Sequence, residues 1–286
     1  MEQIIDDINK LKIEQKKGLS RNIIDKFYTK QNITNLCLDN ININLKIDKY
    51  KDLIIEPSAG NGSFIPVIKK LCNNYKFLDI EPDNSEIVKQ DFLTFNYNNL
   101  KFKKIHIIGN PPFGRQSSLA IKFIKYATLF CHSISFILPK SFKKDSLKNK
   151  FPLSFHCIYE IDLPDNSFLV NGTEHNVPCI FQIWKKKEIA REPIIKLIPS
   201  NYKFVKKNEN PDISIRRVGG RAGNIDIKSN DKSIQSHYFI KFDTFNNNIL
   251  NKLNTLEFKN KDDTVGPKSI SKQELIKELN KINIYL

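Results

Sequence analysis

The alternation of short apolar segments with amphipathic ones is the feature that most constrains the fold of this chain. Four apolar runs have the length of buried strands: 51–56, 75–79, 104–109 and 135–138. The segments 63–71 and 117–130, which lie between these runs, space their apolar residues as helices do. Alternation of helices with such short strands predicts an α/β fold built on a Rossmann-like, doubly wound sheet.

The pattern changes toward the end of the chain. Segments 155–161 and 178–184 alternate well enough to pair as late antiparallel strands, and Lys185-Lys186-Lys187 ends the pattern. Near the start, residues 20–39 look helical. We expect three parts: a lead-in segment of residues 1–19, an α/β domain of residues 20–188 and a small basic region of residues 189–286.

The loops that follow the strands are the candidate ligand sites, because ligands of such sheets bind beyond the carboxyl ends of the strands. The loop from Glu56 to Phe64 contains Gly60 and Gly62, which permit positive φ and close backbone approach. It has no Gly-Lys-Ser/Thr and is not a P-loop. Asp79, 17 residues after Gly62, is placed to accept the hydroxyls of a ribose. The alternatives are plain strand–helix packing and an ordinary surface acid.

The most specific feature is Asn110-Pro111-Pro112-Phe113, directly after the strand that ends at Gly109. Two consecutive prolines fix φ and remove two N–H donors, which leaves rigid carbonyls free to accept. Asn110 adds a side-chain carbonyl, and Phe113 offers a flat face whose stacking contributes about 1–3 kcal/mol. This set suits a planar group with an NH₂, accepted by the Asn110 side chain and the Pro111 backbone oxygen. The alternative is a structural turn.

The order of these loops resembles the gamma-type adenine-specific amino methyltransferases over residues 20–188. Phe27-Tyr28-Thr29 resembles their motif that caps the methionine end of the cofactor, and Asp91 resembles their acid that accepts from the cofactor's adenine amine. The resemblance implies a methyltransferase sheet, S-adenosylmethionine as cofactor and direct methyl transfer to the 6-amino group of adenine. It implies two sets of site residues, the catalytic Asn110, Pro111, Pro112 and Phe113, and the cofactor-binding Phe27, Tyr28, Thr29, Glu56, Pro57, Ser58, Ala59, Gly60, Gly62, Asp79, Ile80, Asp91, Phe92 and Asn110.

The charge of the chain favours nucleic acid as its partner. Lys and Arg number 46 against 31 Asp and Glu, a net charge of +15, although a lysine-rich genome would also produce this excess. Arg216, Arg217 and Arg221 stand among glycines, where they predict phosphate contacts. A solvated flexible loop is the alternative reading of that segment.

DNA is the favoured substrate, because the motif order and a basic region after the catalytic domain are typical of the DNA enzymes. Phe113 keeps RNA open, since many DNA enzymes have Tyr there and RNA adenine methyltransferases also use Phe. A protein glutamine methyltransferase and a non-catalytic nucleic-acid-binding subunit are further alternatives.

The remaining features concern the compartment. Five scattered cysteines without a C-x-x-C and histidines without ligand spacing predict no metal site. No signal peptide and no apolar run of about 20 residues are found, so we expect a soluble intracellular protein, cytoplasmic or nuclear, with no membrane contact. His106 is expected to be a satisfied core residue. The oligomeric state and the roles of His175 and His237 stay open.

Overall fold

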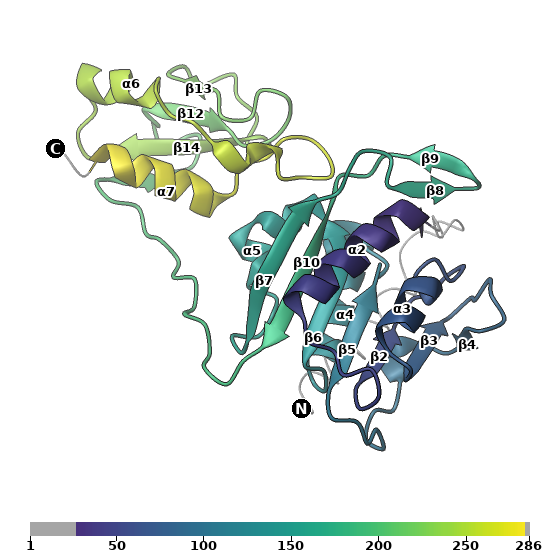
Figure 1. The fold of residues 1–286 in the computed structure, drawn as a ribbon. Helices are drawn as coiled ribbons and strands as arrows, with labels where there is room; N and C mark the ends of the chain where they lie inside the picture. The colour runs from purple at the N-terminus through teal and green to yellow at the C-terminus, as the bar shows by residue number, and fades with distance from the viewer. Residues whose placement is uncertain (1–26, 284–286) are drawn as a thin grey trace. The chain divides into compact units, whose positions relative to one another are not determined.

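A computed structural model describes residues 27–283 of the chain, so the predicted lead-in of residues 1–19 lies outside the described residues. The chain divides into two compact units. The first unit comprises Met1–Pro139 and Lys150–Arg191, and the second comprises Lys140–Asn149 and Glu192–Leu286. Each unit has its own sheet (Figure 1).

The first unit is built on a seven-stranded sheet. In spatial order its strands are β4 (Val88–Lys89), β3 (Tyr75–Asp79), β2 (Leu53–Glu56), β5 (Ile105–Gly109), β6 (Ser133–Pro139), β10 (Cys179–Lys186) and β7 (Phe155–Asp162). Neighbouring strands from β4 to β6 are parallel, whereas β10 is antiparallel to both β6 and β7. The predicted Rossmann-like, doubly wound fold with a late antiparallel pair is confirmed.

The order of the strands reverses between β2 and β5. Ile54 pairs with His106 and Ile55 with Ile107, so the strand ends at Glu56 and Gly109 lie at the same edge of the sheet. Every residue of β2 and β5 is buried, which explains why these strands are continuous apolar runs rather than alternating ones. This reversal brings the two most informative loops of the sequence together.

Helices cover both faces of this sheet (Figure 1). The helices α2 (Gln31–Asn44) and α3 (Ile65–Leu71) share one hydrophobic core with β2, β5, β6 and β10. The helix α4 (Ser118–Ala127) lies on the other face, where its apolar side packs against the segment of Phe92. Short helical turns complete the first unit: η2 (Phe92–Thr94) and η3 (Arg115–Ser117).

The predicted helix over 20–39 is wrong for residues 27–30 and right from residue 31 onward; residues 20–26 lie outside the described range. Tyr28–Thr29 form the short strand β1, which pairs with β8 (Phe168–Val170), and β8 pairs with β9 (Thr173–His175). The backbone N–H of Lys30 donates to Ser167 O at 3.1 Å. Pairing with a partner distant in sequence therefore decides this conformation, and local propensity does not.

The second unit has a four-stranded antiparallel sheet that the sequence analysis did not anticipate. In spatial order its strands are β11 (Tyr202–Phe204), β14 (His237–Phe242), β12 (Ile213–Arg216) and β13 (Ile225–Asp226). Its helical elements are η4 (Lys140–Lys143), α5 (Asp145–Lys148), α6 (Asn247–Leu253), η5 (Lys259–Asp262) and α7 (Lys272–Asn283). One face of the sheet shares a separate hydrophobic core with α6 and α7. This basic region is therefore a folded unit.

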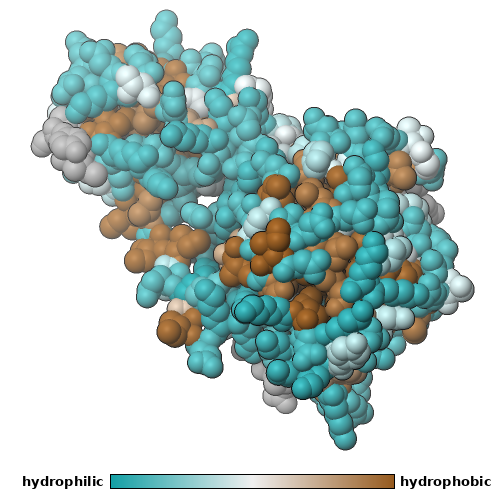
Figure 2. All heavy atoms as spheres, in the orientation of Figure 1, coloured by the Kyte–Doolittle hydropathy of each residue, from teal (hydrophilic) through white to brown (hydrophobic). Residues whose placement is uncertain are grey.

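An extended segment leads into the second unit. The amide of Gln273 bonds both the N–H and the carbonyl of Leu197, and Asn280 bonds Ile198 O and Ser200 N–H in the same way. Ile195 and Ile198 in this segment are 78% and 79% exposed, and Figure 2 shows apolar side chains along it. Helix α7 thus holds the segment by its backbone and leaves isoleucines in solvent.

Candidate active site

The glycine loop after β2 is fixed to the end of β3. The N–H of Gly60 donates to Asp79 Oδ2 at 2.8 Å, and the N–H of Ala59 donates to Leu78 O at 2.9 Å. Asp79 Oδ1 accepts from the N–H of Glu81 at 2.8 Å. The carboxylate of Asp79 therefore shapes two loops, and its half-buried position leaves lone pairs for a ligand hydroxyl.

Tyr28 lies against this loop. Gly60 has a φ of 53°, and a Cβ at that position would lie 3.2 Å from Tyr28 Cε1. The hydroxyl of Tyr28 donates to Asp83, and burial together with Asp83 raises the pKa of Tyr28 to about 12. The backbone at Gly60 thus approaches an aromatic ring closely, and its positive φ together with this close approach favours glycine. The predicted capping motif and the predicted cofactor loop are in contact.

Glu56 is a buried acid without a partner. Its side chain is 1% exposed, and Oε2 has no hydrogen bond. Burial, with a smaller contribution from the negative charge of Asp79, raises the pKa of Glu56 well above its usual value. A Cβ at Gly109 would lie 3.2 Å from Glu56 Cγ, so the backbone of β5 packs directly on this side chain. Both causes favour the protonated form of Glu56 over the carboxylate.

The amide of Asn110 is held at one end and unpaired at the other. Its Nδ2 donates to Thr29 Oγ1 at 3.3 Å and to Phe27 O at 3.5 Å. A backbone carbonyl can only accept, so this contact fixes which end of the amide carries the nitrogen. Asn110 Oδ1 is buried with no hydrogen-bond partner, while Asn110 O accepts from Ser58 Oγ at 3.0 Å. An oriented acceptor without a donor is the chemical signature of this site.

The rest of the proline motif connects the strand to α4. Pro111 is buried, whereas Pro112 and Phe113 are half-buried, and Phe113 packs against the core on the side of α2. The carbonyl of Phe113 accepts from the N–H groups of Leu119 and Ala120 at 3.1 and 3.3 Å. The carbonyl of Phe113 therefore binds two N–H groups in the first turn of α4, and part of its ring is covered by the core.

The loop after β4 also lies at this edge. The N–H of Gln90 donates to Asp79 O at 2.8 Å, and Asp91 Oδ1 accepts from Leu93 N–H at 2.8 Å. Phe92 is 1% exposed and its ring meets those of α4, so its side chain serves packing. Ile80 is 53% exposed beside Asp79 and has a free apolar side chain. Pro57 also lies at this edge, because a Cβ added at Gly109 would be 3.6 Å from Pro57 Cδ.

The arginines of the second unit lie apart from this site in sequence and differ in their contacts. Arg216 Nε donates to Val218 O at 3.1 Å. Arg217 donates from Nε and Nη2 to Gln235 O at 3.0 and 2.8 Å and lies over the ring of Tyr238. The side chain of Arg221 is exposed and bonds to no other residue in the described part of the chain, although its carbonyl accepts from the N–H of Asn224 at 3.1 Å. Two of the three side chains thus shape their own loop, although both keep unused N–H donors.

Two features of the site had no signal in the sequence. Ser135 Oγ, on β6, is buried without a hydrogen-bond partner, and its residue is level with Ile108 of β5. The role of Thr29 as the anchor of the Asn110 amide depends on β1, which was expected to be helical.

His175 lies against the ring of Phe27 at 5.3 Å, and His237 Nδ1 lies 3.1 Å from Ser233 O.

A second polar cluster lies at the opposite, amino end of the strands. His106 Nδ1 is 2.7 Å from Ser133 Oγ, and His106 Nε2 is 3.2 Å from Asp52 Oδ2. Burial lowers the pKa of His106. The residue types are those of a hydrolase triad, but the contacts of the two ring nitrogens are exchanged, since in a triad the serine meets Nε2 and the acid meets Nδ1, and Ser133 is only 1% exposed. The expected satisfied core histidine is found, with partners that the sequence did not indicate.

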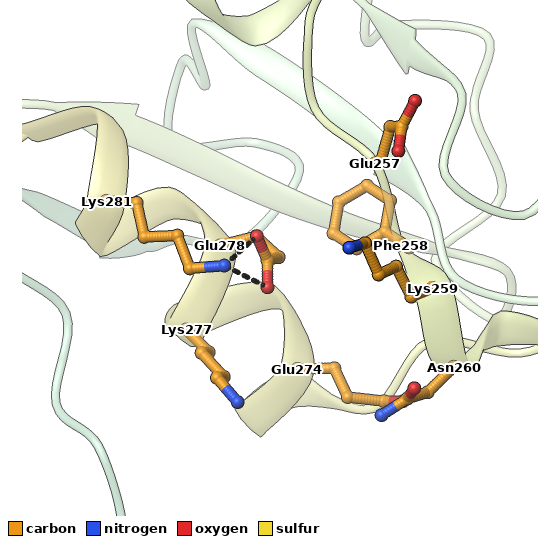
Figure 3. A pocket seen from close by; sticks show the side chains of 8 residues that line it. All are labelled: Glu257, Phe258, Lys259, Asn260, Glu274, Lys277, Glu278 and Lys281. Atoms are coloured by element: carbon orange, nitrogen blue, oxygen red, sulfur yellow. Dashed lines mark hydrogen bonds and ion pairs between the residues drawn. The ribbon is translucent and has the colours of Figure 1, made fainter.

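Other parts of the described chain offer less chemistry. No group of three or more metal-binding side chains is found among residues 27–283, and none of their helices has the length and apolar character to span a bilayer. A hollow in the second unit is lined by residues of both charges (Figure 3). There Lys281 pairs with Glu278, so the charges compensate each other and define no ligand.

Comparison with known proteins adds structural matches only, since the sequence matches no protein-family model and no curated protein. A candidate RNA methyltransferase of Pyrococcus horikoshii matches at 14% identity and a TM-score of 0.45, covering 57% of this chain and 87% of that one. A candidate class I S-adenosylmethionine-dependent methyltransferase of Listeria monocytogenes matches at 14% identity and a TM-score of 0.42, covering 69% of this chain and 72% of that one. A candidate methyltransferase of Streptococcus mutans in complex with SAH matches at 13% identity and a TM-score of 0.36, covering 53% of this chain and 95% of that one. The fold class rests on the strand order of this chain itself.

Proposed function

We propose that this protein is an S-adenosylmethionine-dependent methyltransferase that acts on the 6-amino group of adenine in nucleic acid. The observation that carries the proposal is the buried, unpaired Oδ1 of Asn110. A buried acceptor without a donor costs about 1–3 kcal/mol, and an incoming NH₂ group relieves that cost. The Asn110 amide cannot turn away, because its nitrogen is held by Thr29 and Phe27.

The residues present fit the cofactor. Gly60 and Gly62 have φ values of 53° and 87°, and the lack of side chains at both positions lets a ligand approach the backbone of the loop closely. In this proposal Asp79 accepts the ribose hydroxyls, and Asp91 accepts the amine of the cofactor's adenine. Tyr28 closes the loop from the side of β1. When bound, the cofactor supplies an electrophilic methyl group.

The chain's own contribution to the reaction is position and electrostatics. Asn110 Oδ1 and the carbonyl of Pro111 accept the two hydrogens of the target amine and stabilise the positive charge that develops there. Half-buried Phe113 orients the base by stacking. Because Asn110 Oδ1 is enclosed, substrate binding must part the side chains around it. In a duplex the base must also leave the stack, at a cost of a few kcal/mol.

We propose DNA as the substrate, with the second unit as the part that contacts phosphates. The net charge of +15 and exposed Arg221 support nucleic acid. Arg216 and Arg217 contribute the N–H donors that their own loop does not use. RNA is the alternative, since the pocket chemistry is the same for adenine in either polymer.

Radiolabelled methyl transfer to matched DNA and RNA pools, followed by nucleoside analysis, tests this function. The expected product is 6-methyladenine in DNA. Incorporation into structured RNA alone would replace the substrate and keep the pocket chemistry. Label in protein glutamine, or in no acceptor while the cofactor binds, would overturn the proposed activity.

A further inference from the structure

Glu56 has an environment that the proposed methyl transfer does not by itself explain. No described residue donates a hydrogen bond to its carboxyl group, and the side chain is 1% exposed. The backbone of Gly109 packs on its side chain, and the residue that follows, Asn110, is uncharged. The charge that acts on Glu56 is that of Asp79 from β3, which is also negative. A carboxylate buried without a cation costs several kcal/mol, so the acid keeps its proton.

This neutral acid lies beside the place where the cofactor's positive charge must come. The methyl group has to meet an amine held at Asn110, and Asn110 follows Gly109, whose backbone packs on Glu56. A cofactor bound so as to deliver its methyl group there would bring its sulfonium toward Glu56, which is 1% exposed and so is poorly screened by water. A cation at that position supplies the counter-charge that the apoprotein lacks.

We propose that Glu56 gives up its proton when a cationic cofactor occupies the site, and that it thereby distinguishes S-adenosylmethionine from its product, whose sulfur is uncharged; this inference rests on the proposed function. The O–H bond of the Glu56 carboxyl breaks, the proton passes to the solvent buffer, and the carboxylate faces the sulfonium. After methyl transfer the counter-charge is gone, so the carboxylate takes a proton back and favours release of the product.

The linkage has a definite sign. Burial and Asp79 raise the pKa of Glu56 in the free protein, and a nearby cation lowers it. Cofactor binding that releases protons tightens as the pH rises, by a factor below about ten per pH unit for a single group. The ratio of cofactor affinity to product affinity therefore increases with pH. Tyr28, whose pKa is raised to about 12, stays protonated throughout and does not contribute.

Isothermal titration calorimetry in buffers of different ionisation enthalpy counts the protons. Both S-adenosylmethionine and S-adenosylhomocysteine share the amino acid and the adenosine, so the difference between their proton release isolates the sulfonium charge. We expect the wild type to release more protons with S-adenosylmethionine. Glu56→Gln, which resembles the neutral acid, should bind both ligands with no difference in release. Glu86→Gln, at an exposed acid paired with Lys69, is the matched control and should behave as the wild type.

Equal proton release with the two ligands, or an unchanged difference in Glu56→Gln, overturns this inference and leaves the methyltransferase proposal standing. Failure of the wild type to bind S-adenosylmethionine at all overturns both. If Glu56→Gln does not fold, infrared difference spectroscopy of the wild type decides. The band of a protonated carboxyl must then disappear on addition of S-adenosylmethionine and persist with S-adenosylhomocysteine; a band that persists with both ligands overturns the inference.

Discussion

At the scale of single residues, the two ends of the Asn110 amide have opposite surroundings. The nitrogen donates to Thr29 and Phe27, and the oxygen is buried without a partner. An asparagine that served only as a turn residue would have both ends satisfied or in water. Glu56 Oε2, at the end of the neighbouring strand, is likewise buried without a hydrogen-bond partner. Unsatisfied buried groups at one edge mark the place where a ligand completes the structure.

Asn110→Ala should lower methyl transfer by about 10²–10³-fold, because it removes one preorganised acceptor from the developing positive charge. Folding and cofactor affinity should stay close to those of the wild type. Single-turnover methylation and calorimetry measure the two properties separately. Near-normal turnover would show that Asn110 only shapes the turn.

Thr29→Val should lower turnover by about three- to tenfold while the cofactor dissociation constant is kept. Valine has the shape of threonine but cannot accept the hydrogen bond from Asn110 Nδ2, a loss of about 0.5–1.5 kcal/mol. Thr29→Ser restores the acceptor and should restore turnover. A weaker cofactor affinity with normal turnover would assign Thr29 to the cofactor and not to the positioning of Asn110.

Glu56 should make the protein less stable as the pH rises. An unfolded Glu ionises near about pH 4.3, whereas burial keeps the pKa of Glu56 in the folded chain well above that value. Its stabilising contribution is complete below the unfolded pKa and is lost as the pH rises through the folded pKa. Denaturant unfolding across this range should show a smaller loss in Glu56→Gln. Parallel curves for wild type and variant would mean that Glu56 is ionised in the folded state.

At the scale of elements, continuous apolar strands were predictable and short paired strands were not. The sequence predicted β2 and β5, because burial on both faces leaves an apolar run, and it predicted the late pair from the alternation of apolar and polar residues. It missed β1, a strand of two residues that exists through its pairing with β8. The positions of the site loops were predictable, because they follow from the strand ends. The contact of Thr29 with Asn110 was not, because it depends on β1.

Strand β12 and the loop after it give a pair of arginines with separable roles. Arg217→Ala should destabilise the second unit by about 1 kcal/mol, since it removes two bonds to Gln235 O. Arg221→Ala should leave the melting temperature unchanged and lower the log–log salt slope of nucleic-acid binding by about one. Melting curves and salt titrations on both variants check this. An unchanged slope for Arg221→Ala would exclude it from phosphate contact.

At the scale of the whole molecule, two units with separate cores should unfold in separate steps. Trp184, the only tryptophan, lies in the first unit and stacks on Phe151 at 3.8 Å, so its fluorescence reports on that unit alone. S-adenosylmethionine should raise the midpoint of the fluorescence transition, while circular dichroism should also record a second transition that does not move. One coincident transition by both methods would show that the units unfold as one.

The division of the chain has a consequence for modularity. Residues 140–149, between β6 and β7, belong with residues 192–286, so the backbone passes between the two units at three places. Phe142 in that insert is fully buried. The second unit is therefore built from two separate stretches of the chain and is not a cassette appended at one point of the sequence. A transplant of this unit onto another scaffold, by an engineer or by recombination, must therefore carry two pieces of the gene. A shortened chain that ends near residue 191 keeps residues 140–149 without the rest of their unit.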